Sequence, residues 1–185
     1  MSRKNFGAQP ILYPQPVLIV ATYDENGRPN AMNAAWGGIC GRDEIMIDMS
    51  NHKTTENIAA IKAFTVSMAD VEHLAACDYV GLVSAKNEPQ KMEKAGFTTT
   101  KSGLVNAPII NELPVTLECE LKEIVDGSKY IGRIVNVSVD ERVLGEDGKV
   151  DLTKFHPIIF DSVTAGYYAF GERAGSAFKD GAQLK

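Results

Sequence analysis

Apolar and polar positions alternate along several short stretches of this 185-residue chain, as they do in half-buried strands. In residues 45–50 the apolar side chains recur at every second position, which predicts a strand. In residues 115–122 four apolar side chains alternate with four polar ones, which predicts a strand with one buried and one wet face. Cys119 lies on the apolar face and is expected to pack in the core.

Two dipeptides predict tight hairpin turns. Asn26-Gly27 separates two strand-like runs, and Asp126-Gly127 separates another two. Both residues of such pairs tolerate positive φ, which two-residue hairpin turns require. In the second arm of the later hairpin Arg133 shares a face with apolar residues, so it is expected at a barrel rim or in an ion pair.

Helical spacing and cap residues predict a few short helices. Ile58 and Ile61 recur at helical spacing, Asp70 is suited to begin a helix over 71–80, and Pro89 and Gly96 are suited to begin and end another. Further strands are expected at 64–69 and, unless that part is an irregular closing segment, at 158–163 and 166–171. Residues 98–108 form the loosest stretch, expected to be a functional surface loop.

Hairpin-linked antiparallel strands with a few short helices predict a mainly β fold, a small β-barrel with helical insertions. The length suits one domain over residues 1–185. The chain has no regular β-α-β alternation with G-x-G-x-x-G, no P-loop and no G-x-S-x-G elbow. A Rossmann domain, a P-loop nucleotide site and a serine hydrolase are therefore not expected.

Composition narrows the functional classes. The net charge of −5 disfavours a nucleic-acid binder or a protein of anionic membranes, which would need a basic surface. No signal-peptide core and no apolar run of about 18 residues occurs. Three cysteines and three histidines are widely scattered, so no disulfide framework and no metal site is expected. We expect a cytoplasmic, metal-free protein.

The stretch "MSNHKTTENI" places polar side chains between a predicted strand and a predicted helix. Asn51, His52, Lys53, Thr54 and Thr55 surround what should be a helix N-terminus. Unpaired N–H groups and the positive end of the helix dipole favour an anion there. The alternative is that Thr54 only caps the helix while Lys53 points to water.

The arm "RPNAMNAAW" combines small side chains with one terminal tryptophan. Small residues would let a flat molecule approach the backbone and bond its N–H and C=O groups. The alternative is a strand packed tightly beneath another strand. The polar residues 51–55 at the predicted helix start are here called the anion seat. A flat heteroaromatic ring with a phosphate tail would contact both this arm and the anion seat, and FMN is such a molecule.

Five segments, in order, resemble the flavin reductase-like, flavoredoxin-type family of FMN-binding split-barrel proteins: "GRPNAMNAAW", "SNHKTTENI", "CDYVGLVS", "KAGFTTTKSGLVNAP" and "YYAFGERAGSAF". They extend from about residue 16 to residue 178. The resemblance implies an antiparallel Greek-key split barrel that forms a homodimer, with FMN near the subunit interface.

The resemblance also implies which residues contact FMN. The isoalloxazine would lie against the small-residue arm, the phosphate at the anion seat, and a serine and a tyrosine would make further contacts. These cofactor-binding residues are Ala31, Met32, Asn33, Ala34, Ala35, Trp36, Ser50, Asn51, His52, Lys53, Thr54, Thr55, Asn57, Ser84 and Tyr168.

Two places leave roles open. Family members often carry Ser-Gly-Arg where this chain has Ser84, Ala85 and Lys86, and lysine cannot make the bidentate contact of arginine. Tyr167, Tyr168 and Phe170 would close over the ring if the last segment matches, or they are core aromatics.

The resemblance implies an oxidoreductase in which FMN carries the chemistry. NAD(P)H would donate a hydride, and electrons would leave to free flavin, a ferric complex or a partner protein. That hydride step requires no acid or base, so no catalytic residue is assigned, and His52 is expected to bind or cap. The alternatives are a flavoredoxin-like electron carrier that does not itself use NAD(P)H, and a split-barrel module whose flavin site has decayed.

Overall fold

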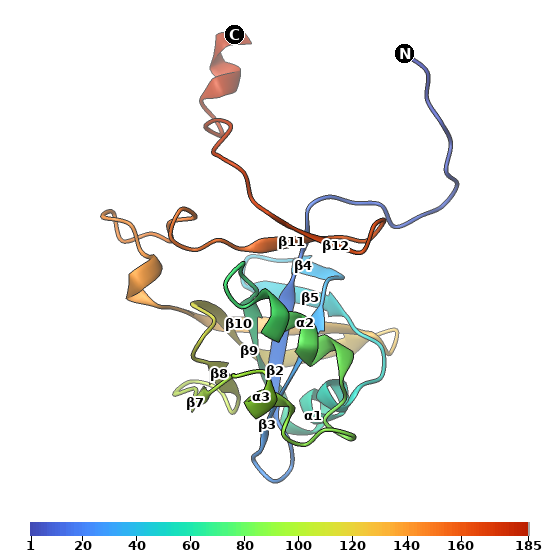
Figure 1. Ribbon diagram of the computed structural model, residues 1–185, viewed down its shortest axis with the longest axis vertical. Coiled ribbons are helices and arrows are strands. Elements are labelled where there is room, and N and C mark those ends of the chain that lie inside the picture. The colour runs from blue at the N-terminus through green and yellow to red at the C-terminus, as the bar shows by residue number, and fades with distance from the viewer. Residues whose placement is uncertain (185) are drawn as a thin grey trace.

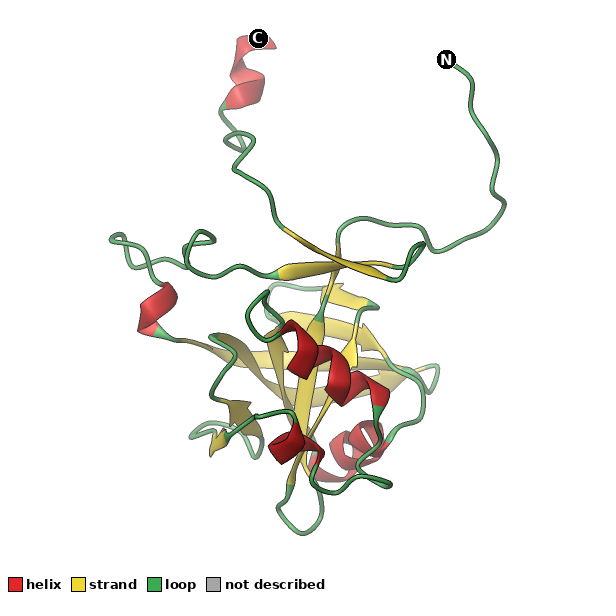
Figure 2. Ribbon diagram, viewed as in Figure 1, coloured by secondary structure: helices red, strands yellow, loops and turns green. Residues whose placement is uncertain are grey.

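The computed structural model describes residues 1–184, and its centre is one antiparallel sheet curled into a half-barrel (Figures 1 and 2). The spatial order of its seven strands is β3-β2-β6-β9-β10-β5-β4. The mainly β, split-barrel fold expected from the sequence is therefore confirmed. The strands are β2 (Leu18–Tyr23), β3 (Pro29–Ala34), β4 (Gly37–Ile39), β5 (Glu44–Asp48), β6 (Ala63–Met68), β9 (Val115–Val125) and β10 (Lys129–Val139).

Strands β3 and β4 follow each other in the chain but lie at opposite edges of this sheet. Only Ala35 and Trp36 connect them, and the Trp36 carbonyl accepts a 2.7 Å hydrogen bond from Asp48 N–H at the end of β5. The sheet must therefore curl until its two edges approach. Within the described chain β3 pairs with β2 alone, which leaves the hydrogen-bonding groups of its outer edge available.

Both predicted hairpins are confirmed. Strands β2 and β3 pair across the Asn26-Gly27 turn, where Gly27 has φ of +76°. Strands β9 and β10 pair across Asp126-Gly127, with φ of +52° and +75°. Positive φ occurs at both residues of the later turn but at Gly27 alone in the earlier one.

The prediction of one wet face on β9 is only partly correct. Thr116 and Glu118 are buried like their apolar neighbours, and the wet face begins at Glu120. Glu118 accepts hydrogen bonds from Ser102 and from Asn136 Nδ2, the latter at 2.6 Å. Cys119 is buried as predicted, and burial raises the pKa of its thiol to about 12.

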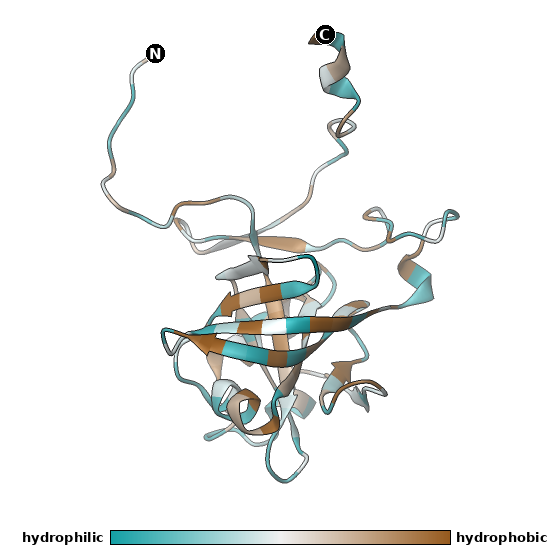
Figure 3. Ribbon diagram, turned by 180° about the vertical axis from the view of Figure 1, so that it is seen from behind, coloured by the Kyte–Doolittle hydropathy of each residue, from teal (hydrophilic) through white to brown (hydrophobic). Residues whose placement is uncertain are grey.

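The outer face of β10 is exposed and carries apolar as well as charged residues. Val135 and Val137 are exposed, and Arg133 forms an ion pair with Glu120 on β9. Of the two roles considered for Arg133, the structure supports pairing. Figure 3 shows the resulting alternation of apolar and polar bands along these strands.

Three short helices lie against the sheet: α1 (Lys53–Ile61), α2 (Leu74–Leu82) and α3 (Lys91–Lys94). The N-cap of α1 is His52, so the alternative in which Thr54 caps this helix is wrong. Helix α2 begins at Leu74, later than expected, and Asp70 instead accepts the His73 N–H at 2.8 Å in the turn before it. Gly96, with φ of +75°, follows α3 as predicted.

The remaining segments form two smaller sheets and two single-turn helices. Residues 98–108 are more ordered than expected, since they contribute to a hairpin and bury Ser102, Val105 and Ala107. Both C-terminal strands are present and pair with each other. The elements are β1 (Gln15–Pro16), β11 (Ile158–Asp161), β12 (Gly166–Ala169), β7 (Thr99–Lys101), β8 (Pro108–Ile110) and the 3-10 helices η1 (Glu141–Val143) and η2 (Asp180–Leu184).

Strand β2 separates two apolar cores. Ile19 and Ala21 face a cluster that includes residues of α2 and α3, whereas Leu18 and Val20 face the interior of the half-barrel. This alternation is the period of two of a strand covered on both faces. The terminal segments extend away from the barrel on the side of β11 and β12 (Figure 1). In the described part, no helix is long and apolar enough to cross a membrane.

Candidate functional site

A groove follows β3 along its free edge. It consists of three hollows of 290, 180 and 270 Å³, here called the aromatic, cationic and outer hollows. The aromatic and cationic hollows share Met32, Asn33 and His52. The cationic and outer hollows share Asn30 and Lys53, so the three are continuous.

The aromatic hollow lies where β3 passes into β4. Ala34 and Ala35 form its floor, Trp36, Phe160 and Tyr167 line it as aromatics, and Ser50 and His52 lie at its border with α1. Phe160 on β11 and Tyr167 on β12 contact each other with ring centroids 5.8 Å apart. A free strand edge beside aromatic rings suits a flat ligand with hydrogen-bonding groups on its rim.

The cationic hollow lies between the N-terminus of α1 and the C-terminus of α2. Its lining includes Lys53, Lys91, His52 and Thr54, and no carboxylate is among the described residues that line it. Within residues 1–184 the backbone N–H groups of Lys53 and Thr54 donate to no protein acceptor. Two lysines and a helix N-terminus, in a hollow whose described lining has no carboxylate, favour an anion.

Lys91 is the residue that sequence reasoning missed. Its side chain is 3% exposed, and its Nζ donates to the carbonyls of Val80 and Val83 at 3.0 and 2.8 Å. Burial lowers the pKa of this ammonium from 10.5 to about 8. In sequence it lies in "PQKMEKAG", where a lysine predicts only an exposed helix position, so no local signal could have found it.

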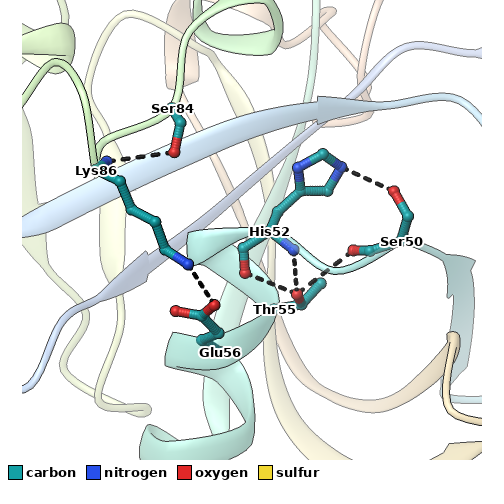
Figure 4. A network of polar contacts seen from close by, with 6 residues as sticks. All are labelled: Ser50, His52, Thr55, Glu56, Ser84 and Lys86. Atoms are coloured by element: carbon teal, nitrogen blue, oxygen red, sulfur yellow. Dashed lines mark hydrogen bonds and ion pairs between the residues drawn. The ribbon is translucent and has the colours of Figure 1, made fainter.

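Polar contacts order the start of α1 (Figure 4). Thr55 Oγ1 accepts the His52 N–H at 2.8 Å, and the His52 ring nitrogen Nε2 lies 3.0 Å from Ser50 Oγ. Thr54 is buried and accepts a 2.8 Å hydrogen bond from Asn30 Nδ2 on β3. Thr54 therefore ties the helix to the edge strand, and Thr55 closes the first turn.

The outer hollow is lined by more charged side chains, but most of them form ion pairs. Arg28 pairs with Asp24, and Lys86 pairs with Glu56 of α1 at 2.6 Å. The Lys86 contact holds the pKa of the Glu56 carboxyl below its usual range. Among the described residues, the buried side-chain atoms without a hydrogen-bond partner are Asn30 Oδ1 and Asn57 Nδ2, and both asparagines line this hollow.

The structure brings most of the predicted site residues to this groove. Some lie elsewhere: Ala31 is fully buried in the core, Asn51 is exposed, Thr55 is internal to the α1 cap, and Tyr168 is 53% exposed. None of these four lines the three hollows, and Tyr167 occupies the wall instead of Tyr168. The predicted residues that do line the groove are Met32, Asn33, Ala34, Ala35, Trp36, Ser50, His52, Lys53, Thr54, Asn57 and Ser84.

Comparison with known proteins identifies the family. The family model described as "Flavin reductase like domain" matches residues 11–162. The chain belongs to this family. Among solved structures, it is similar to flavoredoxin of Desulfovibrio vulgaris (Miyazaki F), with 37% identity and a TM-score of 0.93 over 97% of this chain and 100% of that one.

Other similar proteins extend the comparison. A flavoredoxin from Methanosarcina acetivorans is 25% identical with a TM-score of 0.88, and all of both chains is covered. An FMN-binding domain of a flavin reductase-like enzyme from Shewanella baltica OS155 is 18% identical over 88% of this chain and 89% of that one, with a TM-score of 0.78, and supports the fold alone. An uncharacterized protein of Aquifex aeolicus (strain VF5) is 29% identical over 175 residues, 88% of each chain. The resemblance noted in the sequence is therefore confirmed.

Proposed function

We propose that this chain is an FMN-binding oxidoreductase that uses NAD(P)H to reduce its flavin and passes the electrons to a second acceptor. The observation that carries the proposal is the continuous groove along β3, aromatic at one end and lined at the other by two lysines with no carboxylate in the described lining. FMN has the same asymmetry, a flat ring and a phosphate dianion joined by a polyol chain.

The residues present fit such a ligand. The ring would lie in the aromatic hollow against Ala35 and Trp36, with its rim facing the free edge of β3. The phosphate would lie at the N-terminus of α1 beside Lys53, where charge-assisted hydrogen bonds are strong. The orphaned Asn57 Nδ2 offers a further donor close to Lys53, in the hollow they share.

When bound, FMN would supply the ability to take up a hydride and release electrons singly or in pairs. The residues of this chain then bind, orient and shield. A hydride transfer requires no acid or base, so no catalytic residue is assigned, and the contact of His52 with Ser50 gives His52 a binding and capping role. Ser84, at the rim of the cationic hollow, is assigned a flavin contact on position alone.

A second candidate is an electron carrier that receives electrons from a partner protein and does not use NAD(P)H. The similarity to two flavoredoxins over nearly the whole chain supports this reading. The acidic net charge of −5 would suit docking to a basic redox partner.

One experiment separates these candidates. The purified protein is loaded with FMN, its visible spectrum is recorded, and NADH or NADPH is added without oxygen. Bleaching by either nucleotide supports the reductase, and persistent colour with a chemically reducible flavin supports the carrier. Failure to bind FMN at all would overturn both.

We also propose that the chain forms a homodimer. Exposed apolar side chains lie on both terminal segments, among them Phe6, Leu12 and Phe178, and Val137 is exposed on β10. Such residues on extended arms favour a second copy as the surface that covers them. Light scattering should give twice the chain mass of 20.1 kDa. A monomer that holds FMN tightly would contradict this proposal.

A further inference from the structure

Three side chains from three separate elements form a hydrogen-bonded chain in the wall of the aromatic hollow. Tyr167 on β12 donates its hydroxyl to Asp78 Oδ1 on α2 at 2.8 Å. Asn33 Nδ2 on β3 lies 3.5 Å from the Tyr167 hydroxyl oxygen and donates to the Cys77 carbonyl at 3.1 Å. These contacts tie the C-terminal layer to the helix and to the edge strand.

The acceptors in this chain fix the direction of every hydrogen. A carboxylate and a backbone carbonyl can only accept, so Tyr167 must donate to Asp78, and the Asn33 amide nitrogen must face the Cys77 carbonyl. Reversing the amide would place two acceptor oxygens against each other. Burial and the Asp78 contact raise the pKa of Tyr167 to about 12, so its hydroxyl keeps its hydrogen at neutral pH.

Asn33 therefore has one unused group, its carbonyl oxygen. Within residues 1–184 no group donates to Asn33 Oδ1, and the residue borders both the aromatic and the cationic hollow. Helix α2 lies very close to it: a Cβ added at Gly81 would come within 2.9 Å of Asn33 Cβ. The side chain is held between the helix and the groove.

We infer that Asp78 and Tyr167 are positioning residues that hold Asn33 Oδ1 as a hydrogen-bond acceptor for the N3–H group of an isoalloxazine ring. This inference rests on the proposed flavin site. N3–H is the one N–H group of the oxidised ring, so a fixed acceptor in the hollow selects that edge of the ring. The hydroxyl of Tyr167, absent from a phenylalanine of the same shape, supplies the second contact that holds the Asn33 amide, beside the Cys77 carbonyl.

The test is a thermodynamic cycle with two ligands, which differ at ring position N3, and two proteins, which differ at residue 167. Dissociation constants are measured by flavin fluorescence for riboflavin and 3-methylriboflavin, with the wild-type chain and with Tyr167→Phe. Because a typical hydrogen bond contributes roughly 0.5–1.5 kcal/mol, 3-methylation should weaken wild-type binding roughly two- to thirteenfold. Tyr167→Phe should weaken riboflavin by a similar factor and bind both ligands about equally.

Two further variants keep the result interpretable. Tyr168→Phe removes an exposed hydroxyl from the neighbouring position of β12 and should leave both constants unchanged. Asn33→Leu removes the acceptor itself and should also abolish the difference in affinity between the two ligands. This expectation does not depend on whether Tyr167→Phe folds. Melting of each flavin-free variant shows whether it is folded.

An equal penalty for 3-methylation in the wild type and in Tyr167→Phe would overturn the inference, as would no penalty in the wild type. Either result leaves the proposed function intact, because riboflavin and FMN still bind. A wild-type chain that binds neither ligand overturns the flavin site and this inference with it.

Discussion

The two ends of the groove recognise a ligand by different physical means. The aromatic hollow consists of a free strand edge, alanines and aromatic rings, with an amide oriented by its neighbours. The cationic hollow consists of lysines and a helix N-terminus with no carboxylate among its described lining residues. Shape and neutral hydrogen bonds act only in close contact, whereas charge responds to pH and salt. Changes at the two ends should therefore have separable consequences.

The largest effect is expected at the floor of the aromatic hollow. Ala34 packs against the half-barrel core, whereas Ala35 belongs to none of the apolar clusters of the described chain. Ala35→Leu should fill the hollow and abolish FMN binding, with little change in the melting temperature of the flavin-free protein. Ala34→Leu should overpack the core and cost about 1–3 kcal/mol of unfolding free energy.

Melting of the flavin-free variants and titration with FMN give both quantities for this pair. If both variants bind FMN normally, β3 does not line the ring site.

The next largest effect is expected at the cationic end. Lys53→Ala removes a charge beside the α1 N-terminus and should weaken FMN roughly tenfold or more, since a hydrogen bond to a charged group contributes about 1.5–3 kcal/mol. Riboflavin, which has no phosphate, should bind nearly as before. Fluorescence titration with both ligands measures the ratio, and equal losses would place the phosphate elsewhere.

The buried Lys91 should make flavin binding depend on pH. Its pKa of about 8 means that it loses its charge as pH rises through 8, so FMN affinity should fall between pH 7 and pH 9 while riboflavin affinity changes less. In Lys91→Met this extra pH dependence should disappear. Lys94→Met, an exposed neighbour paired with Glu88, is the matched control.

The same lysine affects stability with a defined sign. Its folded pKa of about 8 lies below the ordinary 10.5, so between these values the unfolded chain binds more protons than the folded one. Unfolding free energy should therefore rise with pH over this window, by at most about 3 kcal/mol. Thermal melting of the wild type minus that of Lys91→Met isolates this contribution. A difference independent of pH would mean that Lys91 keeps an ordinary pKa.

The smallest effect is expected from Lys86. Its ion pair with Glu56 is exposed, and such pairs contribute about 0–1 kcal/mol. Lys86→Ala should change FMN affinity less than Lys53→Ala does and leave stability almost unchanged. A loss as large as that of Lys53→Ala would move the phosphate toward the outer hollow.

Local signals were sufficient for much of the fold. Asn26-Gly27 and Asp126-Gly127 predict their hairpins because Gly27, Asp126 and Gly127 themselves adopt positive φ. The polar stretch at residues 50–55 predicts an anion seat because the strand-to-helix transition is local. These features depend on neighbours in sequence, which the sequence displays directly.

Features that depend on distant neighbours could not be predicted in this way. Lys91 is buried only because α3 packs beside the end of α2, and the choice of Tyr167 over Tyr168 depends on which face of β12 meets α2. Glu118 is buried because residues 102–107 fold over β9. In each case the pattern of apolar and polar residues within the segment would be the same without these distant contacts, so the pattern does not reveal them.

The free edge of β3 has a consequence for the protein before any ligand binds. An uncovered strand edge with small side chains is a template on which another chain can add a strand. A molecule bound along that edge would compete with such pairing, so cofactor supply would govern aggregation as well as activity. A bound flavin would then keep the edge strand β3 from pairing with strands of other molecules.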